Sequence, residues 1–308
     1  MKRLLFIYNL HSGKGLIRNH LADIIDTFNK AGYETVVYST QERADATRLA
    51  KELGASYDLV VCSGGDGTLS EVLDGVMTID EKRRPKIGYI PAGSTNDYAY
   101  SLGLPSQMKR CANMIAEEKF RAVDVGKFQE NSYFVYVAAF GAFTEVSYAT
   151  PQHLKNLLGH QAYVLEGVKS LAALKPYKVK VTSNELQVED SFVYGMVSNT
   201  ESVGGMRGLA GTGVDLQDGL FEVTLIKEIK NPMEVQQLVT AFLSKNFEKC
   251  DVLYSFKTSK ITFESEEAIK WTLDGEYGGE WKEMRLEVEP RAIEFIIKKR
   301  KEKTKKLN

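Results

Sequence analysis

The first 125 residues alternate between short apolar runs and segments with helical periodicity. The apolar runs predict buried strands, and the segments between them predict amphipathic helices, because their apolar residues recur at three- and four-residue spacing. The predicted strands are Leu4–Tyr8, Thr35–Tyr38, Leu59–Cys62 and Ile87–Ile90, and the predicted helices are Ile17–Ala31, Glu42–Leu53 and Thr68–Met77. When strands and helices alternate along a chain, each helix forms a crossover between two parallel strands of a sheet. The pattern therefore predicts an α/β domain with a parallel sheet.

From about Val125 onward, strand-like runs follow one another with few helical segments between them. Such a succession favours antiparallel pairing of neighbouring strands. The predicted strands are Ser132–Ala139, Tyr177–Thr182, Phe192–Ser198, Phe221–Ile226, Lys260–Phe263 and Lys270–Leu273, and the predicted helices are His153–Leu174 and Pro232–Asn246. We therefore expect a mainly antiparallel second domain.

The chain length of 308 residues fits two domains of ordinary size. The change of pattern predicts a first domain over residues 1–125 and a second domain over residues 126–286. We expect the last predicted strand, Ala292–Lys298, to pair back onto the first domain. Residues 287–308 are therefore assigned to the first domain.

Charge and cysteine content exclude several classes of protein. Forty Lys and Arg against 41 Asp and Glu leave a formal net charge of -1, which gives no reason to expect a nucleic-acid partner. The three cysteines lie far apart, which argues against a disulfide framework or a zinc site and predicts a reducing compartment. The N-terminal apolar run lacks the features of a signal peptide, and the longest uncharged stretch, Asn131–Thr144, is too short for a membrane-spanning helix. We expect a cytoplasmic protein.

The C-terminal segment Lys298–Lys306 is strongly basic. Such a tail either stays solvated and frayed or is attracted to an anionic membrane surface. The sequence alone leaves both interpretations open.

The strongest local signal for chemistry is the segment Val60–Leu69, in which an apolar strand ends in Gly64-Gly65-Asp66-Gly67-Thr68. Glycines let backbone amides approach a phosphate closely, and the helix that begins near Thr68 points its positive end at the phosphate. Asp66 would repel a bare phosphate, so its presence indicates a bound cation as well. A plain Asp-Gly turn between strand and helix is the alternative interpretation.

Two further loops of small and polar residues follow predicted strands. The segment Asn9–Gly15 contains one lysine and lacks the spacing of a Walker loop, although its composition suits an anionic ligand. The segment Pro91–Ala99 again places small and hydroxyl residues before a helix. Because the carboxyl ends of parallel strands meet at one edge of a sheet, we expect the three loops to face a single crevice.

The loops Gly64–Thr68 and Pro91–Asp97 and the distant segment Thr272–Glu276 together resemble the diacylglycerol kinase catalytic-domain family, and most closely its soluble bacterial lipid kinases. The glycine element alone is shared with NAD kinases and distantly with phosphofructokinase, whereas the combination is specific. The order and spacing of the motifs fit along almost the entire chain. The resemblance implies a nucleotide-binding first domain of the phosphofructokinase and NAD-kinase kind and a β-sandwich-like second domain that takes the lipid.

The resemblance also implies roles for individual residues. Glu276 is the expected general base, and Asp66 is expected beside the phosphates and magnesium; both are assigned as catalytic. The expected nucleotide-binding residues are Asn9, Ser12, Gly13, Lys14, Thr40, Gly64, Gly65, Gly67, Thr68, Glu71, Ser94, Asn96 and Asp97. A carboxylate such as that of Glu276 can accept a proton from an attacking hydroxyl, although the segment around it could also be only a turn after the strand Ile269–Leu273.

A second metal site is implied by the same resemblance. Its expected ligands are Asp215, Asp218 and the backbone carbonyl of Leu220. Oxygen ligands three residues apart in a loop suit a hard cation, and we expect a structural role for this ion. The alternative is a polar turn before the strand Phe221–Ile226.

Three positions depart from the family pattern. Leu10 stands where proline is usual, and Ser94 stands where threonine is usual, so the hydroxyl is kept. His160 and Gln161 stand where a basic residue is often found, within the predicted lipid domain. None of these changes removes a group needed for phosphate transfer.

The sequence therefore predicts an ATP- and Mg²⁺-dependent lipid kinase that most closely fits conversion of diacylglycerol to phosphatidic acid. We expect peripheral contact with the inner face of the membrane, and an exposed sheet edge leaves a homodimer open. An NAD kinase and a non-catalytic lipid- or nucleotide-binding regulator are the competing interpretations. The acceptor is not fixed among diacylglycerol, other acylglycerols, long-chain bases and polyprenols, because specificity lies in the second domain.

Overall fold

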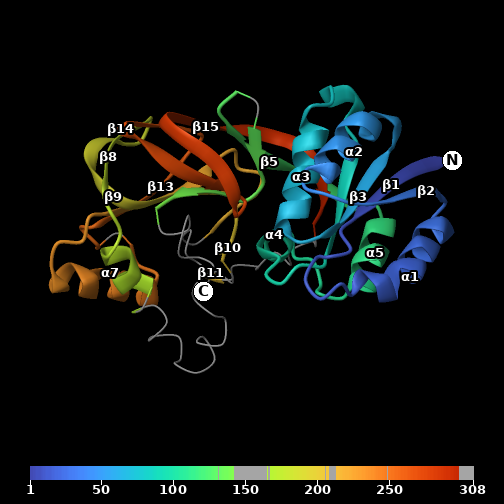
Figure 1. Cartoon of the computed structure of the whole chain (residues 1–308), viewed down its shortest axis with the longest axis horizontal. Helices are drawn as coiled ribbons and strands as arrows, with labels where there is room; N and C mark the ends of the chain where they lie inside the picture. Colours follow the sequence, from blue (N-terminus) through green and yellow to red (C-terminus); the bar gives the residue numbers. More distant parts are fainter. Residues whose placement is uncertain are drawn as a thin grey trace, which may run out of the picture.

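The computed structural model describes residues 1–130, 132–141, 165, 167–204, 206–207, 213–247 and 249–297. Most of the predicted helix His153–Leu174, together with His160, Gln161 and the basic segment Lys298–Lys306, lies outside the described residues. Figure 1 shows a helix-rich part, which holds the N-terminus, beside a strand-rich part. No helix in the described residues is long and apolar enough to cross a membrane.

The helix-rich part is built on four strands that pair in parallel in the order β2-β1-β3-β4. Its elements are β1 (Lys2–Tyr8), α1 (Ile17–Lys30), β2 (Tyr33–Ser39), α2 (Asp45–Leu53), β3 (Leu59–Gly64), α3 (Asp66–Met77), β4 (Lys86–Pro91), α4 (Asp97–Ser101) and α5 (Met108–Ala116), with single 3-10 turns at Gly54–Ser56 and Glu81–Arg83. Because the four strands run the same way, the loops after β1, β3 and β4 leave the sheet at one edge.

Both faces of these four strands are covered by helices, and the sequence of β1 shows why. Side chains alternate between the two faces of a strand. Leu5 and Ile7 join the apolar cluster that includes residues of α2 and α3, whereas Leu4 and Phe6 join the cluster that includes residues of α1 and α5. Figure 1 shows these two helix pairs on opposite sides of the strands. An apolar run buried on both faces is what a central parallel strand requires.

The strand-rich part continues the same 13-stranded sheet through antiparallel pairs. Its elements are β5 (Phe120–Phe128), β6 (Ser132–Phe134), β7 (Val137–Phe140), β8 (Tyr177–Ser183), β9 (Gln187–Ser198), β12 (Phe221–Lys227), α7 (Pro232–Ser244), β13 (Leu253–Thr258), β14 (Lys260–Leu273) and β15 (Glu276–Ile296). A separate pair is formed by β10 (Ser202–Val203) and β11 (Met206–Arg207). The chain is thus a mixed α/β protein with a strand-rich second part, as the sequence predicts.

The strand β15 joins the two parts. It pairs antiparallel with β14 and β5 along most of its length, and near its end Phe295 pairs with Ile87 of β4 in parallel. The end of β15 therefore lies against β4, at the edge of the first four strands. The domain boundaries at residues 125 and 286 stay predictions.

The sequence prediction was wrong about the extent of several strands. Its single strand Ser132–Ala139 is divided between β6 and β7. It placed two short strands at Lys260–Phe263 and Lys270–Leu273, but both belong to the single strand β14. It also missed β15 before Ala292. Both missed stretches are rich in exposed charged side chains, such as those of Glu264 and Glu287, so they lack the apolar runs on which the prediction depended.

Candidate active site

Glycines allow the three loops after β1, β3 and β4 to touch one another. A Cβ on Gly13 would lie 2.3 Å from the carbonyl oxygen of Ala92, and a Cβ on Gly93 would lie 2.6 Å from the Cα of Gly65. Gly13 also has a φ of 56°, which a residue with a side chain rarely adopts. The loops are joined by the amide of Ala92, which donates to the carbonyl of Gly64 at 2.7 Å. The structure therefore brings the three predicted loops together.

Asparagine side chains fix the shape of two of these loops. Asn9 accepts from the amide of His11 at 2.9 Å. Asn96, which has a φ of 54°, accepts from the amide of Gly93 at 2.9 Å and donates to its carbonyl at 2.7 Å. A third bond reaches Asn96 from the hydroxyl of Tyr89 at 3.2 Å. Asn96 therefore shapes the loop through its side chain, although the sequence placed it among the nucleotide-binding residues.

A cleft of about 460 Å³ opens beside these loops, a volume ordinary for a small-ligand site. It is lined by Asn9, His11, Ser12, Thr40, Gln41, Glu42, Arg43, Gly65, Gly67, Thr68, Glu71 and Glu276. The first turn of α3 contributes Gly67 and Thr68, and the positive end of a helix dipole favours an anion there. Among the predicted catalytic and nucleotide-binding residues, those that do not line the cleft are Gly13, Lys14, Gly64, Asp66, Ser94, Asn96 and Asp97.

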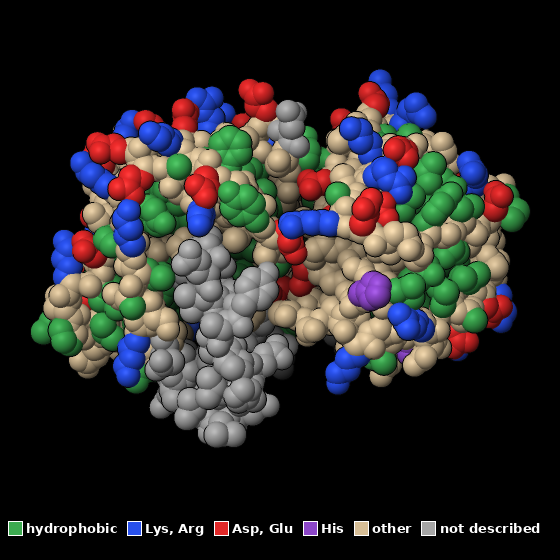
Figure 2. Space-filling view, viewed as in Figure 1, with side chains coloured by type: hydrophobic (Ala, Val, Ile, Leu, Met, Phe, Trp, Pro, Cys, Tyr) green, Lys and Arg blue, Asp and Glu red, His purple; other side chains and the backbone are tan. Residues whose placement is uncertain are grey.

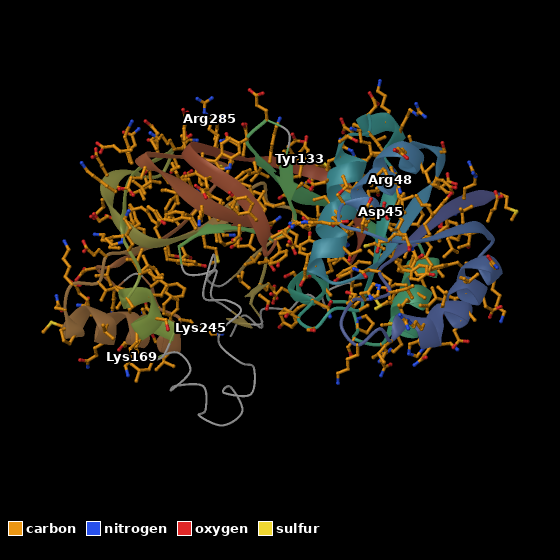
Figure 3. The ribbon with its side chains drawn as sticks, in the orientation of Figure 1. Asp45, Arg48, Tyr133, Lys169, Lys245 and Arg285 are labelled. Carbon is orange, nitrogen blue, oxygen red and sulfur yellow. The ribbon has the colours of Figure 1, made fainter. Side chains whose placement is uncertain are left out.

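The wall of the cleft that follows β2 is held by two carboxylates. Glu71 accepts from the amides of Ala44 at 3.0 Å and Ala46 at 3.3 Å, so it caps the start of α2 from the neighbouring helix α3. Asp45 accepts from the amide of Gln41 at 2.8 Å and pairs with Arg48 at 2.8 Å. Figure 3 shows Asp45 and Arg48 together on α2. These bonds fix residues 41–44 before any ligand binds.

Glu276 reaches the cleft from a tight hairpin between β14 and β15. Asp274 and Gly275 have φ values of 50° and 85°, and Leu273 pairs directly with Glu276, which is the geometry of a two-residue Asp-Gly turn with both central residues at positive φ. The Oε1 atom of Glu276 lies 3.3 Å from the position that a Cβ on Gly67 would take. Folding therefore brings this carboxylate to the first turn of α3.

Arg43 is the single Lys or Arg among the residues that line the cleft in the described part of the chain. Its Nη2 atom lies 3.0 Å from Oε2 of Glu276. Both side chains are largely exposed, at 73% and 56%. Sequence reasoning missed Arg43 because the run Gln41–Asp45 is charged and carries no motif of its own.

Asp66 lies next to the cleft without a cationic partner among the described residues. Its carboxylate accepts from the amides of Asp97 at 2.9 Å and Tyr98 at 3.3 Å. Burial, with smaller contributions from the carboxylates of Asp97 and Asp274, raises the pKa of Asp66 to about 7. A half-buried acid beside other acids is the kind of group that a hard cation stabilises, so Asp66 fits a role in magnesium binding.

Two further acids lie near α3 and were given no role in the prediction. Asp274 is buried and accepts from the amides of Val135, Tyr136 and Val137 at 2.8–3.1 Å, and burial raises its pKa to about 6. Burial likewise raises the pKa of Asp74 to about 7. The predicted motif contained Asp274, but its contacts with β7 depend on the sheet and are not visible in the sequence.

Asp97 connects the two parts of the molecule. Its buried carboxylate accepts from the hydroxyl of Ser202 in β10 at 2.6 Å, while its own amide donates to Asp66. It therefore lies behind the cleft rather than in its wall.

The predicted metal ligands Asp215 and Asp218 lie in a loop where a lysine supplies the positive charge. The Nζ atom of Lys257 lies 2.9 Å from both Asp218 and Glu222. Asp215 accepts from the amide of Gln217 at 3.1 Å, and Asp218 accepts from the amide of Leu220 at 3.1 Å. Within the described ranges, no three His, Cys, Asp or Glu side chains are arranged to hold a metal. Metal binding by Asp215, Asp218 and Leu220 stays a prediction.

The fold and motifs of this chain match two protein families and several known proteins. Residues 3–128 match the diacylglycerol kinase catalytic domain, and residues 137–297 match the YegS C-terminal NAD kinase beta sandwich-like domain. A diacylglycerol kinase of Bacillus subtilis is 34% identical over 281 residues, which cover 91% of each chain. One of Staphylococcus epidermidis is 35% identical over 280 residues, which cover 90% of this chain and 87% of the relative.

Solved structures show the same fold. A chain described as a diacylglycerol kinase from Bacillus anthracis has a TM-score of 0.74 at 24% identity and covers 96% of this chain and 97% of its own length. Another chain from that organism has a TM-score of 0.80 at 26% identity, with coverage of 96% and 95%. Membership of this family implies ATP as the phosphate donor. The chain belongs to the diacylglycerol kinase catalytic-domain family and is a lipid kinase.

Proposed function

We propose that this kinase transfers the γ-phosphate of ATP to the free hydroxyl of diacylglycerol and releases phosphatidic acid and ADP. The observation that carries the proposal is the position of Glu276, whose carboxylate meets the first turn of α3 at the edge of the cleft. The identity of about 34% to enzymes named diacylglycerol kinase supports this acceptor.

In this proposal the cleft holds the nucleotide, as in the phosphofructokinase and NAD-kinase kind of domain. Backbone amides near Gly65, Gly67 and Thr68 face the phosphates, and Arg43 leaves Glu276 to pair with a phosphate oxygen. Phosphoryl transfer depends mainly on positioning and on neutralisation of charge, which amides and one guanidinium can supply. Ser12, Gly13, Lys14 and Thr40 complete the expected nucleotide contacts.

Asp66 is the residue that we propose to hold magnesium, with Asp97 behind it. A bound Mg²⁺ ion supplies positive charge against the phosphates, and a cation at this position also favours the ionised carboxylate of Asp66. The amides of Asp97 and Tyr98 already orient the carboxylate of Asp66.

Glu276 is the proposed general base. Its carboxylate accepts the hydroxyl proton of the lipid while the lipid oxygen forms a bond to the γ-phosphorus and the bond to the bridging oxygen of ADP breaks. The exposed position of Glu276 leaves room for a lipid hydroxyl that approaches from the second part of the molecule. We place the enzyme in the cytoplasm, in peripheral contact with the inner membrane face.

A labelled-ATP assay against a panel of lipids in mixed micelles tests the proposal. The panel contains diacylglycerol, monoacylglycerol, a long-chain base and a polyprenol, with NAD as the non-lipid acceptor. We expect magnesium-dependent labelling of diacylglycerol above all other acceptors. Preferred labelling of another lipid would reassign the acceptor, and labelling of NAD alone would show an NAD kinase. ATP binding without turnover on any acceptor would identify a regulator.

A further inference from the structure

The helix α7 projects from the strand-rich part and shows an outer face with almost no charge. Figure 1 shows it at the lower left edge, far from the helices α1–α5. Its 13 residues include one charged side chain, Glu234, whereas the 26% of charged residues in the whole chain would give about three. The outer positions are Met233, Gln236, Thr240 and Leu243, which recur at helical spacing.

The fold does not need this outer face. Asn231 accepts from the amides of Met233 and Glu234, Pro232 occupies the first turn, and Lys245 ends the helix at a φ of 54°. Leu238 and Ala241 bury the inner face. Met233 remains 71% exposed and Leu243 37% exposed. The helix is therefore capped and anchored without the apolar side chains on its outer side.

The hydroxyls on the outer face already donate to carbonyls of the helix. The hydroxyl of Thr240 donates to the carbonyl of Gln236 at 2.8 Å, and the hydroxyl of Ser244 donates to the carbonyl of Thr240 at 2.7 Å. Removing water from hydroxyls that bond to the helix costs less free energy than removing it from hydroxyls whose only partner is water. A shallow groove of about 370 Å³ runs along this face from Met233 to Lys249. The surface is thus easier to dehydrate than a charged helix face.

Lysines surround the uncharged face. Lys230 precedes the helix, and Lys245 and Lys249 follow it; all three are exposed and form no ion pair with a described residue. Many other lysines of the described part do form such pairs, as Lys178 and Lys227 do. Figure 3 shows Lys245 and also Lys169 toward the lower left, and Figure 2 shows mostly green and tan surface with little red at the lower left edge of the molecule.

We propose that α7 is the surface by which the protein docks on an anionic lipid bilayer. An interfacial helix buries an apolar face at the level of the headgroups while lysines pair with anionic lipids around it. Met233 and Leu243 enter the headgroup region, and Lys230, Lys245 and Lys249 contact the lipid phosphates through their flexible stems. The proposal rests on the proposed function, since a kinase of diacylglycerol takes its acceptor from a membrane.

Flotation with lipid vesicles tests the proposal on the full chain. The vesicles contain either phosphatidylcholine alone or phosphatidylcholine with phosphatidylglycerol. We expect the chain to float with the anionic vesicles, and Lys245→Glu/Lys249→Glu to weaken this binding at least about tenfold, because each lysine near an anionic surface contributes about 1 kcal/mol. Met233→Ser/Leu243→Ser should weaken it by a similar factor through lost apolar burial.

The matched control is Lys51→Glu/Lys82→Glu, which makes the same change in net charge at exposed positions of the helix-rich part. This control should float like the unchanged chain. Equal binding by the α7 variants and the unchanged chain would overturn the proposal. It would also be overturned if the α7 variants changed the oligomeric state on a sizing column and left vesicle binding intact, since α7 would then be a protein interface.

A second assay separates this proposal from the proposed function. With a short-chain diacylglycerol dissolved as monomers, the α7 variants should keep the activity of the unchanged chain. With diacylglycerol in anionic vesicles, they should lose activity in proportion to lost binding. Failure of every variant and of the unchanged chain to phosphorylate either form would contradict the proposed function, whereas vesicle binding would still decide the role of α7.

Discussion

Two regions of this molecule pair a basic side chain with acids, and they differ in how far the pair is exposed. In the cleft, Arg43 and Glu276 are 73% and 56% exposed. In the other region, Lys257 of β13 is 34% exposed and contacts Asp218 in the loop before β12, which is 27% exposed, and Glu222 in β12, which is 5% exposed. An exposed pair contributes about 0–1 kcal/mol and separates easily, whereas the acid of a buried pair cannot lose its partner without a penalty.

The difference in exposure indicates that the two ion pairs have different roles. Arg43 and Glu276 can exchange partners for a phosphate and a hydroxyl at little energetic cost. Lys257 instead neutralises Glu222, whose pKa is raised to about 7 by burial even with the ammonium beside it. The first pair suits catalysis and the second suits stability. The following experiments test that contrast.

The largest effect is expected from Glu276→Gln. Glutamine keeps the size of the side chain but cannot accept the hydroxyl proton, so kcat should fall by about 100-fold to 10,000-fold. Steady-state assays with diacylglycerol measure the loss, and the thermal unfolding midpoint should stay unchanged because the residue is exposed. Unchanged turnover would remove Glu276 from the mechanism.

A loss of stability is expected from Lys257→Met. Removal of the ammonium leaves the buried carboxylate of Glu222 without its partner, which should lower the free energy of unfolding by about 1–3 kcal/mol. Urea titration measures this change, and Lys260→Met is the matched control because Lys260 and Glu287 form an exposed pair. Added Mg²⁺ should restore part of the loss if Asp215 and Asp218 bind a cation. An equal loss of unfolding free energy in Lys257→Met and Lys260→Met would contradict the proposed difference between the buried and the exposed pair.

A smaller effect, confined to substrate binding, is expected from Arg43→Met. The KM for ATP should rise roughly tenfold, because a charged hydrogen bond to phosphate is lost, with a smaller change in kcat. Arg43→Lys should recover part of the affinity, and Arg83→Met, at an exposed position outside the cleft, should leave both constants unchanged. A fall in kcat alone would instead place Arg43 with Glu276 as a positioning residue.

The smallest effect concerns the pH dependence of stability. The pKa of Asp66 is raised to about 7, so the folded chain keeps a proton that the unfolded chain releases near pH 4. The stabilisation from this group is complete below about pH 4 and is lost as the pH rises through about 7. Urea titrations over this range should show a shallower decline for Asp66→Asn than for the unchanged chain. Mg²⁺ should also flatten the decline, since it favours the ionised carboxylate. An identical slope for the unchanged chain, for Asp66→Asn and for the unchanged chain with Mg²⁺ would contradict the raised pKa of Asp66 and its role in magnesium binding.

Elements and loops near the start of the chain could be predicted because their signals are local. The apolar runs of β1 and β3 and the glycines after them depend on neighbours in sequence. The long strand β15 could not be predicted in the same way, because its exposed charged residues are held in place by pairing with β14 and β5. Most of the predicted helix His153–Leu174, including His160, lies outside the described residues, so its extent stays a prediction.

The candidate site could likewise be predicted only in part. The resemblance named Asp66 and Glu276, but the roles of Asn96 and Glu71 in holding loops, and the place of Asp97 behind the cleft, follow only from three-dimensional contacts. Arg43 was missed because a charged loop gives no signal of the distant carboxylate that it meets.

By itself, the sequence determined the alternation of strands and helices, the glycine loops and the tight Asp274-Gly275 turn, since each depends on the backbone preferences of adjacent residues. Only the tertiary structure decided that this turn carries Glu276 to Gly67, and that Lys257 stands beside Asp218. Contacts between residues so far apart in the chain are set by the register of the continuous sheet. That register depends on the burial of many side chains together.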